Sequence, residues 1–272
     1  MNYSLRSFAF CHDEKYDALV ELAEPEEWGP GHKILRNYCD KTFQRAVQLD
    51  APNDPFPDIQ GSGKHLYVRD GICVCFNTGL YTPRYEEIFA LFSPNEVEGK
   101  QPWFLKGFFK ESDGALRQVP VLPERVSFVD DPINLVYDSR LPIRANVDHI
   151  LGDEQNYERI PEDVRNLGES TVRRLFIGAV KEAEDRAAAN YTLAVPQWYN
   201  GQIQLLLPIA LSGDTPDLAL AIHREDGYYS ARTCLSIDMA YNNARLIVRP
   251  EASWITSVRG ERGQEDSCPT GQ

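Results

Sequence analysis

The sequence predicts an α+β fold, with a single domain of mainly antiparallel sheets that are built from hairpins and packed with helices. Three observations lead to this expectation. Helical periodicity occurs near both ends and in the middle of the chain, paired strand-like segments with short turns lie between these helices, and no segment repeats. The length of 272 residues is compatible with one large domain or two small ones. We therefore expect one α+β domain over residues 1–256 and a flexible polar tail over 257–272.

The first 50 residues are predicted to be mainly helical, because apolar side chains recur at about 3.6-residue intervals over 16–23 and again over 34–47. Farther along, the segments 65–69 and 72–76 flank Asp70-Gly71, which is typical of a two-residue hairpin turn. Pairing across such a turn places four side chains on one apolar face: Leu66, Val68, Cys73 and Cys75.

The middle of the chain contains a predicted turn, a short helix and a strand. Asn77-Thr78-Gly79 suits a turn, and Thr82-Pro83 suits the start of a helix, with threonine as N-cap and proline at the first helical position. A strand is predicted over 103–109, whereas residues 111–160 show the weak periodicity of loops.

The last third contains the strongest helical pattern, a continuous apolar stripe from Val172 to Ala183. Strands are predicted over 203–211, 218–223 and 228–235. Ser236 is then expected to cap a final helix that runs to about residue 248.

Composition and charge restrict the classes of function. The chain has 28 Lys and Arg against 41 Asp and Glu, a net charge of −13, which argues against a surface that binds long duplex DNA. No apolar run is long enough to span a bilayer, and the N-terminus lacks the pattern of a signal peptide. The six cysteines and five histidines show no metal-ligand spacing. We therefore expect a cytoplasmic protein with reduced thiols, no metal, no cofactor and no membrane partner.

The acidic excess is unevenly distributed. Residues 61–92 and 232–272 are each neutral, so the acidic excess lies in the rest of the chain. This pattern is compatible with a confined anion-binding cleft between neutral segments, and it favours a small or terminal phosphate as the ligand.

Two groups of polar residues in these neutral segments are candidate anion sites. The first is Asn77-Thr78-Gly79 with Arg84, where a turn would expose backbone N–H groups. The second is the polar column Asp238, Asn242 and Arg245 on the final helix, where arginine would hold a phosphate or carboxylate. An ordinary turn and a solvated helix face are the alternatives, and both stay open.

A third polar cluster surrounds His149, which is the best candidate for a general acid or base because histidine is the side-chain type suited to that role near neutral pH. Asp153, Asn156 and Arg159 follow it in a segment whose Gly152 and Pro161 indicate a loop. A structural role for this histidine is the alternative.

Three stretches of the chain, taken together, resemble the family catalogued as domain of unknown function 3825. They are Asp58–Leu80, Asp148–Arg159 and Thr233–Trp254, and the resemblance covers roughly residues 5–256. The family implies no activity. Its relatives include fusions to small RNA-binding modules such as cold-shock domains, which implies an RNA or nucleotide context.

We expect a nucleotide- or RNA-phosphate-binding protein that processes a phosphorylated nucleotide or RNA end, by phosphoryl transfer or hydrolysis, in a metal-independent cleft. The expected catalytic residues are His149, Asp153 and Asp238. The expected substrate-binding residues are Asn77, Thr78, Gly79, Arg84, Asn156, Arg159, Asn242 and Arg245.

Two alternatives remain open at this point. One is a non-catalytic RNA-binding module that stacks single-stranded bases on Tyr67, Tyr81, Tyr85 and Trp198. The other is an enzyme of secondary metabolism that holds a small carboxylate substrate with its arginine residues.

Overall fold

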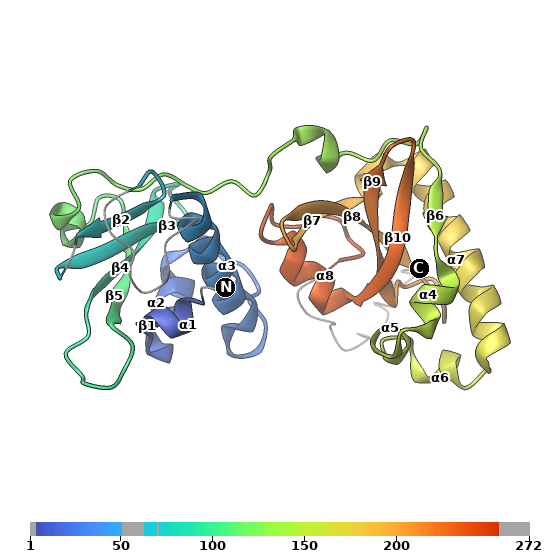
Figure 1. Ribbon diagram of the computed structural model, residues 1–272, viewed down its shortest axis with the longest axis horizontal. Helices are drawn as coiled ribbons and strands as arrows, with labels where there is room; N and C mark the ends of the chain where they lie inside the picture. The colour runs from blue at the N-terminus through green and yellow to red at the C-terminus, as the bar shows by residue number, and fades with distance from the viewer. Residues whose placement is uncertain (1–3, 51–62, 70, 256–272) are drawn as a thin grey trace, which may run out of the picture.

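Two five-stranded sheets organise the chain, and each forms the centre of one lobe (Figure 1). The computed structural model describes residues 4–50, 63–69 and 71–255. A segment that runs from the end of the first sheet to residue 143 crosses from one lobe to the other along one side of the molecule (Figure 1).

The N-terminal lobe has the strand order β1-β5-β4-β3-β2, antiparallel except for the β1–β5 pair. Its strands are β1 (Ala9–Phe10), β2 (Leu66–Arg69), β3 (Cys73–Tyr81), β4 (Glu87–Pro94) and β5 (Trp103–Lys110). Its helices are α1 (Leu5–Phe8), α2 (Asp13–Leu22) and α3 (Lys33–Asp50). Apolar side chains of the helices and of one sheet face form the main core, while Leu116 and Val119 cover the opposite face around Cys73 and Cys75.

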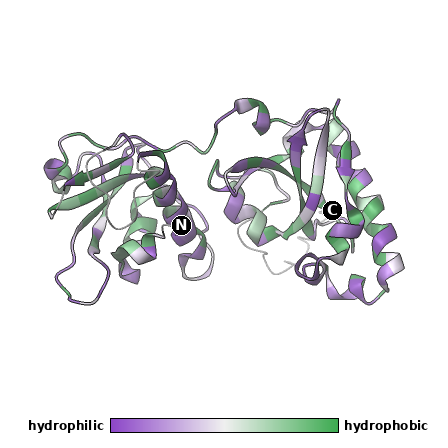
Figure 2. Cartoon of the chain, in the orientation of Figure 1, coloured by the Kyte–Doolittle hydropathy of each residue, from purple (hydrophilic) through white to green (hydrophobic). Residues whose placement is uncertain are grey.

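The C-terminal lobe has the strand order β6-β10-β9-β8-β7, antiparallel except for the β6–β10 pair. Its strands are β6 (Ile143–Ala145), β7 (Val195–Tyr199), β8 (Gln202–Ile209), β9 (Leu218–Glu225) and β10 (Tyr228–Ser236). Its helices are α4 (Val147–Gly152), α5 (Glu154–Glu158), α6 (Glu162–Arg165), α7 (Glu169–Ala189) and α8 (Ile237–Ala244). The amphipathic helix α7 packs its apolar side on one sheet face, and α8 packs on the other (Figure 2).

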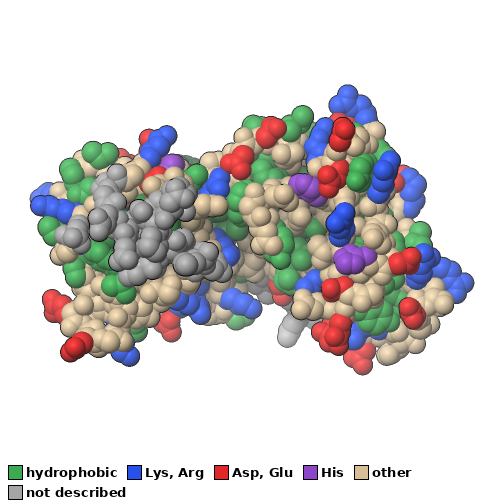
Figure 3. Space-filling model, viewed as in Figure 1, with side chains coloured by type: hydrophobic (Ala, Val, Ile, Leu, Met, Phe, Trp, Pro, Cys, Tyr) green, Lys and Arg blue, Asp and Glu red, His purple; other side chains and the backbone are tan. Residues whose placement is uncertain are grey.

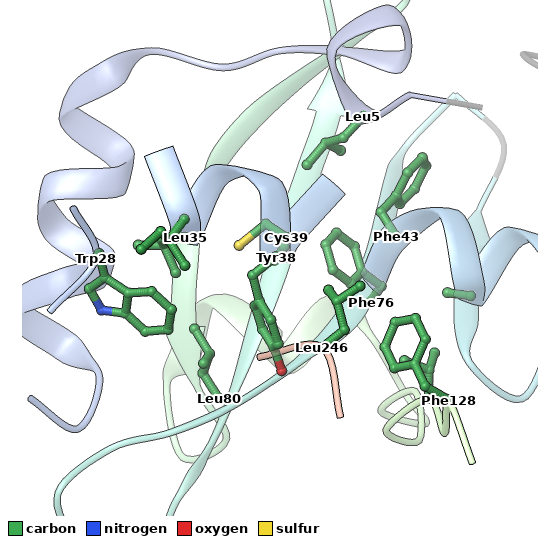
Figure 4. Close-up of a cluster of buried hydrophobic side chains, with 14 of the residues drawn as sticks. Leu5, Trp28, Leu35, Tyr38, Cys39, Phe43, Phe76, Leu80, Phe128 and Leu246 are labelled. Carbon is green, nitrogen blue, oxygen red and sulfur yellow. The ribbon is translucent and has the colours of Figure 1, made fainter. Parts of the chain in front are cut away.

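The main core continues from one lobe into the other. Leu206, Leu235 and Tyr241 of the C-terminal lobe belong to the same buried cluster as the side chains of α3. Figure 4 shows Leu246, which follows α8, among α3 side chains such as Tyr38. Because one apolar core serves both sheets, the chain forms a single α+β domain, as the sequence predicts.

Most of the predicted elements are present. Helices occur at 16–22 and 34–47, within α2 and α3, and the apolar stripe of 172–183 lies on α7. Ser236 caps α8 through its Oγ, which accepts a hydrogen bond from the Met239 N–H at 3.3 Å. This helix ends at Ala244, one turn earlier than the apolar spacing suggests.

The predicted helix after Thr82-Pro83 is wrong, because residues 87–94 form strand β4. Its apolar residues alternate between the two faces: Ile88 and Phe92 join the main core, whereas Phe89 packs with Cys73 and Cys75. A strand that is buried on both faces is a continuous apolar run, and periodicity cannot separate such a run from a buried helix.

The predicted turn at Asn77-Thr78-Gly79 is also wrong. These residues lie inside β3, where the register with β4 is irregular between Asn77 and Tyr81. Gly79 has φ +74°, which accommodates this irregularity within the strand.

The hairpin of β2 and β3 is present, but its register differs from the expected one. Leu66 pairs with Phe76 and Arg69 with Cys73, so the connection has three residues instead of two. A slip of one residue moves every side chain of one strand to the opposite face. Consequently Leu66 and Val68 share a core with Phe76, whereas Cys73 and Cys75 lie on the other face.

The segment 111–160 is less irregular than expected, because it contains two 3-10 turns, β6, α4 and α5. Of the helices in the described residues, none is both long and apolar enough to cross a lipid bilayer. The cysteines in the described part of the chain are free thiols. The predicted tail, 257–272, lies outside the described residues.

Candidate functional site

A polar pocket of about 220 Å³ lies on the α8 side of the second sheet, where α4 and α5 meet β10 and the β7–β8 hairpin. We call it the α5–β10 pocket. Its lining residues are His149, Asp153, Gln155, Asn156, Arg159, Gln197, Tyr199, Gln204, Arg232, Thr233, Leu235 and Met239. The charged side chains of the lining are two arginines, Arg159 and Arg232, and one carboxylate, Asp153.

Hydrogen bonds hold one side of this pocket in place. Asp153 caps α5, since its Oδ1 accepts from the Asn156 N–H at 2.9 Å. The buried Asn156 Oδ1 in turn accepts from Arg159 Nη1 and from Thr233 Oγ1, both at 2.8 Å. Arg159 Nη1 also donates to the Cys234 carbonyl oxygen at 2.6 Å. These contacts bind α5 to β10 and fix the position of the Arg159 guanidinium.

The two pocket arginines, Arg159 and Arg232, make no ion pair with a carboxylate in the described part of the chain. Arg232 occupies a register irregularity between Ala231 and Thr233 and is exposed. An irregularity of this kind redirects a side chain away from the regular alternation of a strand. The pocket therefore presents two cationic groups that form no ion pair with a described carboxylate, although Asp153 belongs to the same lining.

His149 lies on α4 and is exposed at the pocket, so it is not in the predicted loop. Its backbone N–H donates to the Asn146 Oδ1 at 3.1 Å, but its imidazole makes no hydrogen bond to any described residue. The ring is therefore available to a ligand. In the same part of the chain, no group of three or more His, Cys, Asp and Glu side chains is arranged to hold a metal ion.

The floor of the pocket is made of glutamine side chains on adjacent strands. Gln197 on β7 is 1% exposed, and its Nε2 donates to the Oε1 of Gln204 on β8 at 2.8 Å. Its own Oε1 accepts from Asn243 Nδ2 of α8 at 3.0 Å. Because both ends of the Gln197 amide are engaged, the floor is rigid.

Four of the predicted site residues therefore come together in this pocket: His149, Asp153, Asn156 and Arg159. The first predicted anion site does not join them, because it lies in the N-terminal lobe. Asn77 and Thr78 are buried there, and their side chains donate to the carbonyl oxygens of Pro123 and Ile88. Gly79 lies beside them in β3, and Arg84 is exposed in the turn before β4.

Arg245 is also outside the pocket, because it pairs with Glu26 of the N-terminal lobe. Its Nε and Nη2 donate to the two carboxylate oxygens at 2.6 and 2.9 Å. The guanidinium lies 5.0 and 4.7 Å from the ring centroids of Trp28 and Tyr38. Burial by itself lowers the pKa of Arg245, but Glu26, together with the neighbouring Tyr38 and Tyr241, outweighs this effect, so the pKa is raised. The expected solvent-facing column is wrong, because α8 ends at Ala244 and Arg245 turns inward.

Asp238 and Asn242, the remaining predicted residues, lie on α8. Asp238 is exposed, and Asn242 Nδ2 donates to its backbone carbonyl oxygen at 2.9 Å. Neither lines the α5–β10 pocket, although the intervening Met239 does.

Sequence reasoning missed eight lining residues, which are Gln155, Gln197, Tyr199, Gln204, Arg232, Thr233, Leu235 and Met239. A signal for three of them is present, since Asn200-Gly201 between two strand-like segments is the preferred turn of a two-residue hairpin. That turn predicts the β7–β8 hairpin and therefore the pairing of Gln197 with Gln204.

A family model described as domain of unknown function DUF3825 matches residues 19–254. The chain belongs to this family. The α5–β10 pocket and the Glu26–Arg245 pair both lie within the part that matches DUF3825. No curated protein and no solved structure matches the chain.

Proposed function

We propose that this DUF3825 protein binds the phosphate group of a nucleotide or RNA end in the α5–β10 pocket. The observation that carries the proposal is the pair Arg159 and Arg232, which line the pocket without a carboxylate partner among the described residues. Guanidinium groups form short, charge-assisted hydrogen bonds to phosphate oxygens, often two at a time. The amide side chains around them supply further donors and acceptors for a sugar or base.

Binding is tested by isothermal titration calorimetry with a nucleoside monophosphate. Hydrogen bonds to charged groups contribute about 1.5–3 kcal/mol, so Arg159→Ala and Arg232→Ala should each weaken binding by about 10- to 100-fold. Arg174→Ala on α7 is the matched control, because it removes an exposed arginine of the same lobe whose Nε donates only to the Ser170 carbonyl oxygen. Equal affinities for all four proteins would remove the basis of the proposal.

The same titration separates phosphate from carboxylate ligands. Arginine also binds carboxylates, so a small dicarboxylate is titrated alongside the nucleotide. The proposal requires the nucleotide to bind more tightly than the dicarboxylate does. Preferential binding of the dicarboxylate would favour the alternative of an enzyme that acts on a small acid.

For processing of the bound phosphate, the proposal assigns proton transfer to His149. In hydrolysis a water molecule attacks phosphorus while the ester P–O bond breaks, and His149 takes the proton of that water or protonates the leaving oxygen. Asp153 is occupied as the N-cap of α5, and Asp238 lies outside the pocket, so neither is assigned this role.

Phosphate release from nucleotides tests the assignment. His149→Gln should lower the rate by about 10²- to 10⁴-fold with little change in nucleotide affinity. An unchanged rate would exclude His149 as the acid or base, and the absence of turnover in the unaltered protein would reduce the function to binding alone.

A further inference from the structure

A second cavity of about 320 Å³ adjoins the α5–β10 pocket on the other side of Tyr199. It lies between α3 of the N-terminal lobe and the β7–β8 hairpin with α8 of the C-terminal lobe, and we call it the α3–β7 groove. Its lining residues are Lys41, Gln44, Arg45, Gln48, Phe128, Trp198, Tyr199, Asn200, Gly201, Asn243 and Leu246.

One wall of this groove is formed by Trp198, with Arg45 and Phe128 packed against its ring. Arg45 lies with its guanidinium 5.0 Å from the Trp198 ring centroid, and Phe128 meets the same ring edge-on at 5.6 Å. Arg45 is itself held, because its Nε donates to the Ser127 carbonyl oxygen and its Nη2 pairs with Asp130 at 2.9 Å. Trp198 is therefore a fixed surface, and the Arg45 charge is largely offset.

Tyr199 lines both cavities and connects them. It is 49% exposed, at the end of β7, directly before a turn in which Asn200 and Gly201 have φ values of 49° and 84°. Two successive positive φ angles are typical of the tight type I′ hairpin turn, which has a single preferred geometry. The tyrosine is thus presented from a rigid hairpin, and the bond from Asn243 Nδ2 to Gln197 Oε1 links the linings on either side of it.

The chemistry of the combined lining resembles that of a surface for single-stranded nucleic acid. Eight of its residues are Asn or Gln, a side-chain type that can bind the edges of bases. Of these, Asn156 and Gln197 are buried and already engaged within the protein, so the others are the candidates for such contacts. Lys41 adds a cation that makes no ion pair with a described carboxylate and donates to Gln44 Oε1 at 3.2 Å. An exposed tyrosine offers a ring on which a base can stack, and every base has a face suited to this contact.

We infer that the ligand is a single-stranded polynucleotide whose terminal phosphate occupies the α5–β10 pocket and whose next nucleotides continue past Tyr199 into the α3–β7 groove. This inference rests on the proposed function for the terminal phosphate. It extends that function from a mononucleotide to a chain, with Tyr199 as a stacking residue and Lys41 as a contact to a backbone phosphate.

A single strand fits this surface better than a duplex does. The two cavities are small, and Tyr199 can reach the face of a base only where that base is unstacked from its neighbours. The net charge is −13, and the face drawn in Figure 3 shows acidic and basic side chains intermingled, without a broad basic surface for two phosphate backbones.

Fluorescence anisotropy and competition with a length series test the inference. The ligands are a nucleoside monophosphate and 5′- and 3′-phosphorylated oligonucleotides of two, three and six residues, as RNA and as DNA. With the unaltered protein, affinity should rise about tenfold or more between the monophosphate and the three-residue strand. The RNA and DNA arms show which sugar the groove accepts.

Variants of Lys41 and Tyr199 test whether this gain of affinity with strand length comes from the α3–β7 groove. Lys41→Ala should weaken binding of the six-residue strand about tenfold, reduce its salt slope by about 0.7, and leave monophosphate affinity unchanged. Lys33→Ala is the matched control, because it removes an exposed lysine of the same helix that does not line the groove. Tyr199→Ala should also remove the gain with length, whereas Tyr199→Phe should retain it.

The possible outcomes distinguish a failure of this inference from a failure of the proposed phosphate-binding function. Equal affinity for the monophosphate and all strands would overturn the inference and leave phosphate binding intact. A gain with length that survives Lys41→Ala and Tyr199→Ala would also overturn it. If no ligand binds, or if Arg159→Ala binds every ligand with the affinity of the unaltered protein, both the proposed function and the inference are overturned.

Discussion

Arg245 and Arg159 show how the same residue type serves two different purposes in this molecule. Arg245 pairs with Glu26 through two hydrogen bonds, from Nε and Nη2, and aromatic rings pack against its guanidinium. Arg159 is anchored through Nη1 alone, to neutral oxygens of Asn156 and Cys234. The closed pair joins the two lobes, while the anchored but unpaired arginine faces a pocket. In this molecule, therefore, an arginine indicates a ligand site only where no carboxylate pairs with its guanidinium.

The largest expected effect is on stability at the closed pair. Arg245→Ala leaves the Glu26 carboxylate, whose side chain is 4% exposed, with a hydrogen bond from the Tyr241 hydroxyl but without the cation that balances its charge, so we expect the free energy of unfolding to fall by about 3–5 kcal/mol. Arg159→Ala should cost only about 1–2 kcal/mol, because it removes hydrogen bonds to neutral groups. Urea unfolding followed by circular dichroism measures both values.

A double variant provides the control for this comparison. Glu26→Gln with Arg245→Met replaces the buried charges together and should recover a large part of the loss. If the double variant were as unstable as Arg245→Ala, the loss of stability would come from the packing of the Arg245 side chain and not from its ion pair with Glu26.

A second prediction concerns Thr78, which sequence reasoning placed in a binding site. Its Oγ1 donates to the buried Ile88 carbonyl oxygen at 2.6 Å, so Thr78→Val should lower the free energy of unfolding by about 1–3 kcal/mol. Nucleotide affinity of the folded variant should stay the same. Weaker binding by a folded Thr78→Val protein, measured by calorimetry, would return this segment to the list of candidate sites.

A third prediction concerns Asn156, which positions Arg159. Asn156→Ala removes the acceptor of both Arg159 and Thr233, so it should weaken nucleotide binding about tenfold and lower stability by about 1–2 kcal/mol. Thr233→Val removes only one of the two hydrogen bonds and should have a smaller effect on binding. Equal binding by the unaltered protein and Asn156→Ala would mean that Arg159 needs no positioning.

The smallest expected effect is a pH dependence at the closed pair. Burial, together with the adjacent Glu26 carboxylate, raises the pKa of Tyr241 from 10 to about 12. Above pH 10 the unfolded chain loses this proton before the folded protein does, so stability should fall between pH 10 and 12. A shift of two pKa units corresponds to about 2.7 kcal/mol, which solvent screening of a partly buried group reduces to about 1 kcal/mol. Tyr241→Phe should flatten that part of the curve of unfolding free energy against pH. An identical slope in both proteins would contradict the assignment.

Local patterns predict much of this fold, because helix periodicity, caps and hairpin turns are encoded within a few residues. Ser236 and the apolar stripe of α7 are examples. The errors arise where local signals are ambiguous. A two-residue and a three-residue connection both fit the β2–β3 hairpin. A strand that is buried on both faces, such as β4, lacks the alternation of apolar and polar residues that identifies a strand in the sequence.

The candidate site depends on contacts between distant residues, so the sequence could identify only one part of it. His149, Asp153, Asn156 and Arg159 lie close together in the chain, and all four line the pocket. Glu26 and Arg245 are separated by 219 positions, and nothing near Arg245 in sequence indicates that its charge is already paired. Arg232 joins the pocket through a strand irregularity that a regular alternation does not predict.

The most direct test of the claim that Arg159 and Arg232 form the open anion site is nuclear magnetic resonance of the arginine side chains. Nε–Hε resonances are assigned with the Arg159→Lys, Arg232→Lys and Arg245→Lys variants, and a nucleoside monophosphate is then titrated into the labelled protein. We predict that the Arg159 and Arg232 signals shift together with saturation, while the Arg245 signal stays unchanged. A shift of Arg245, or no shift of the two pocket arginines at saturating nucleotide, would contradict this account.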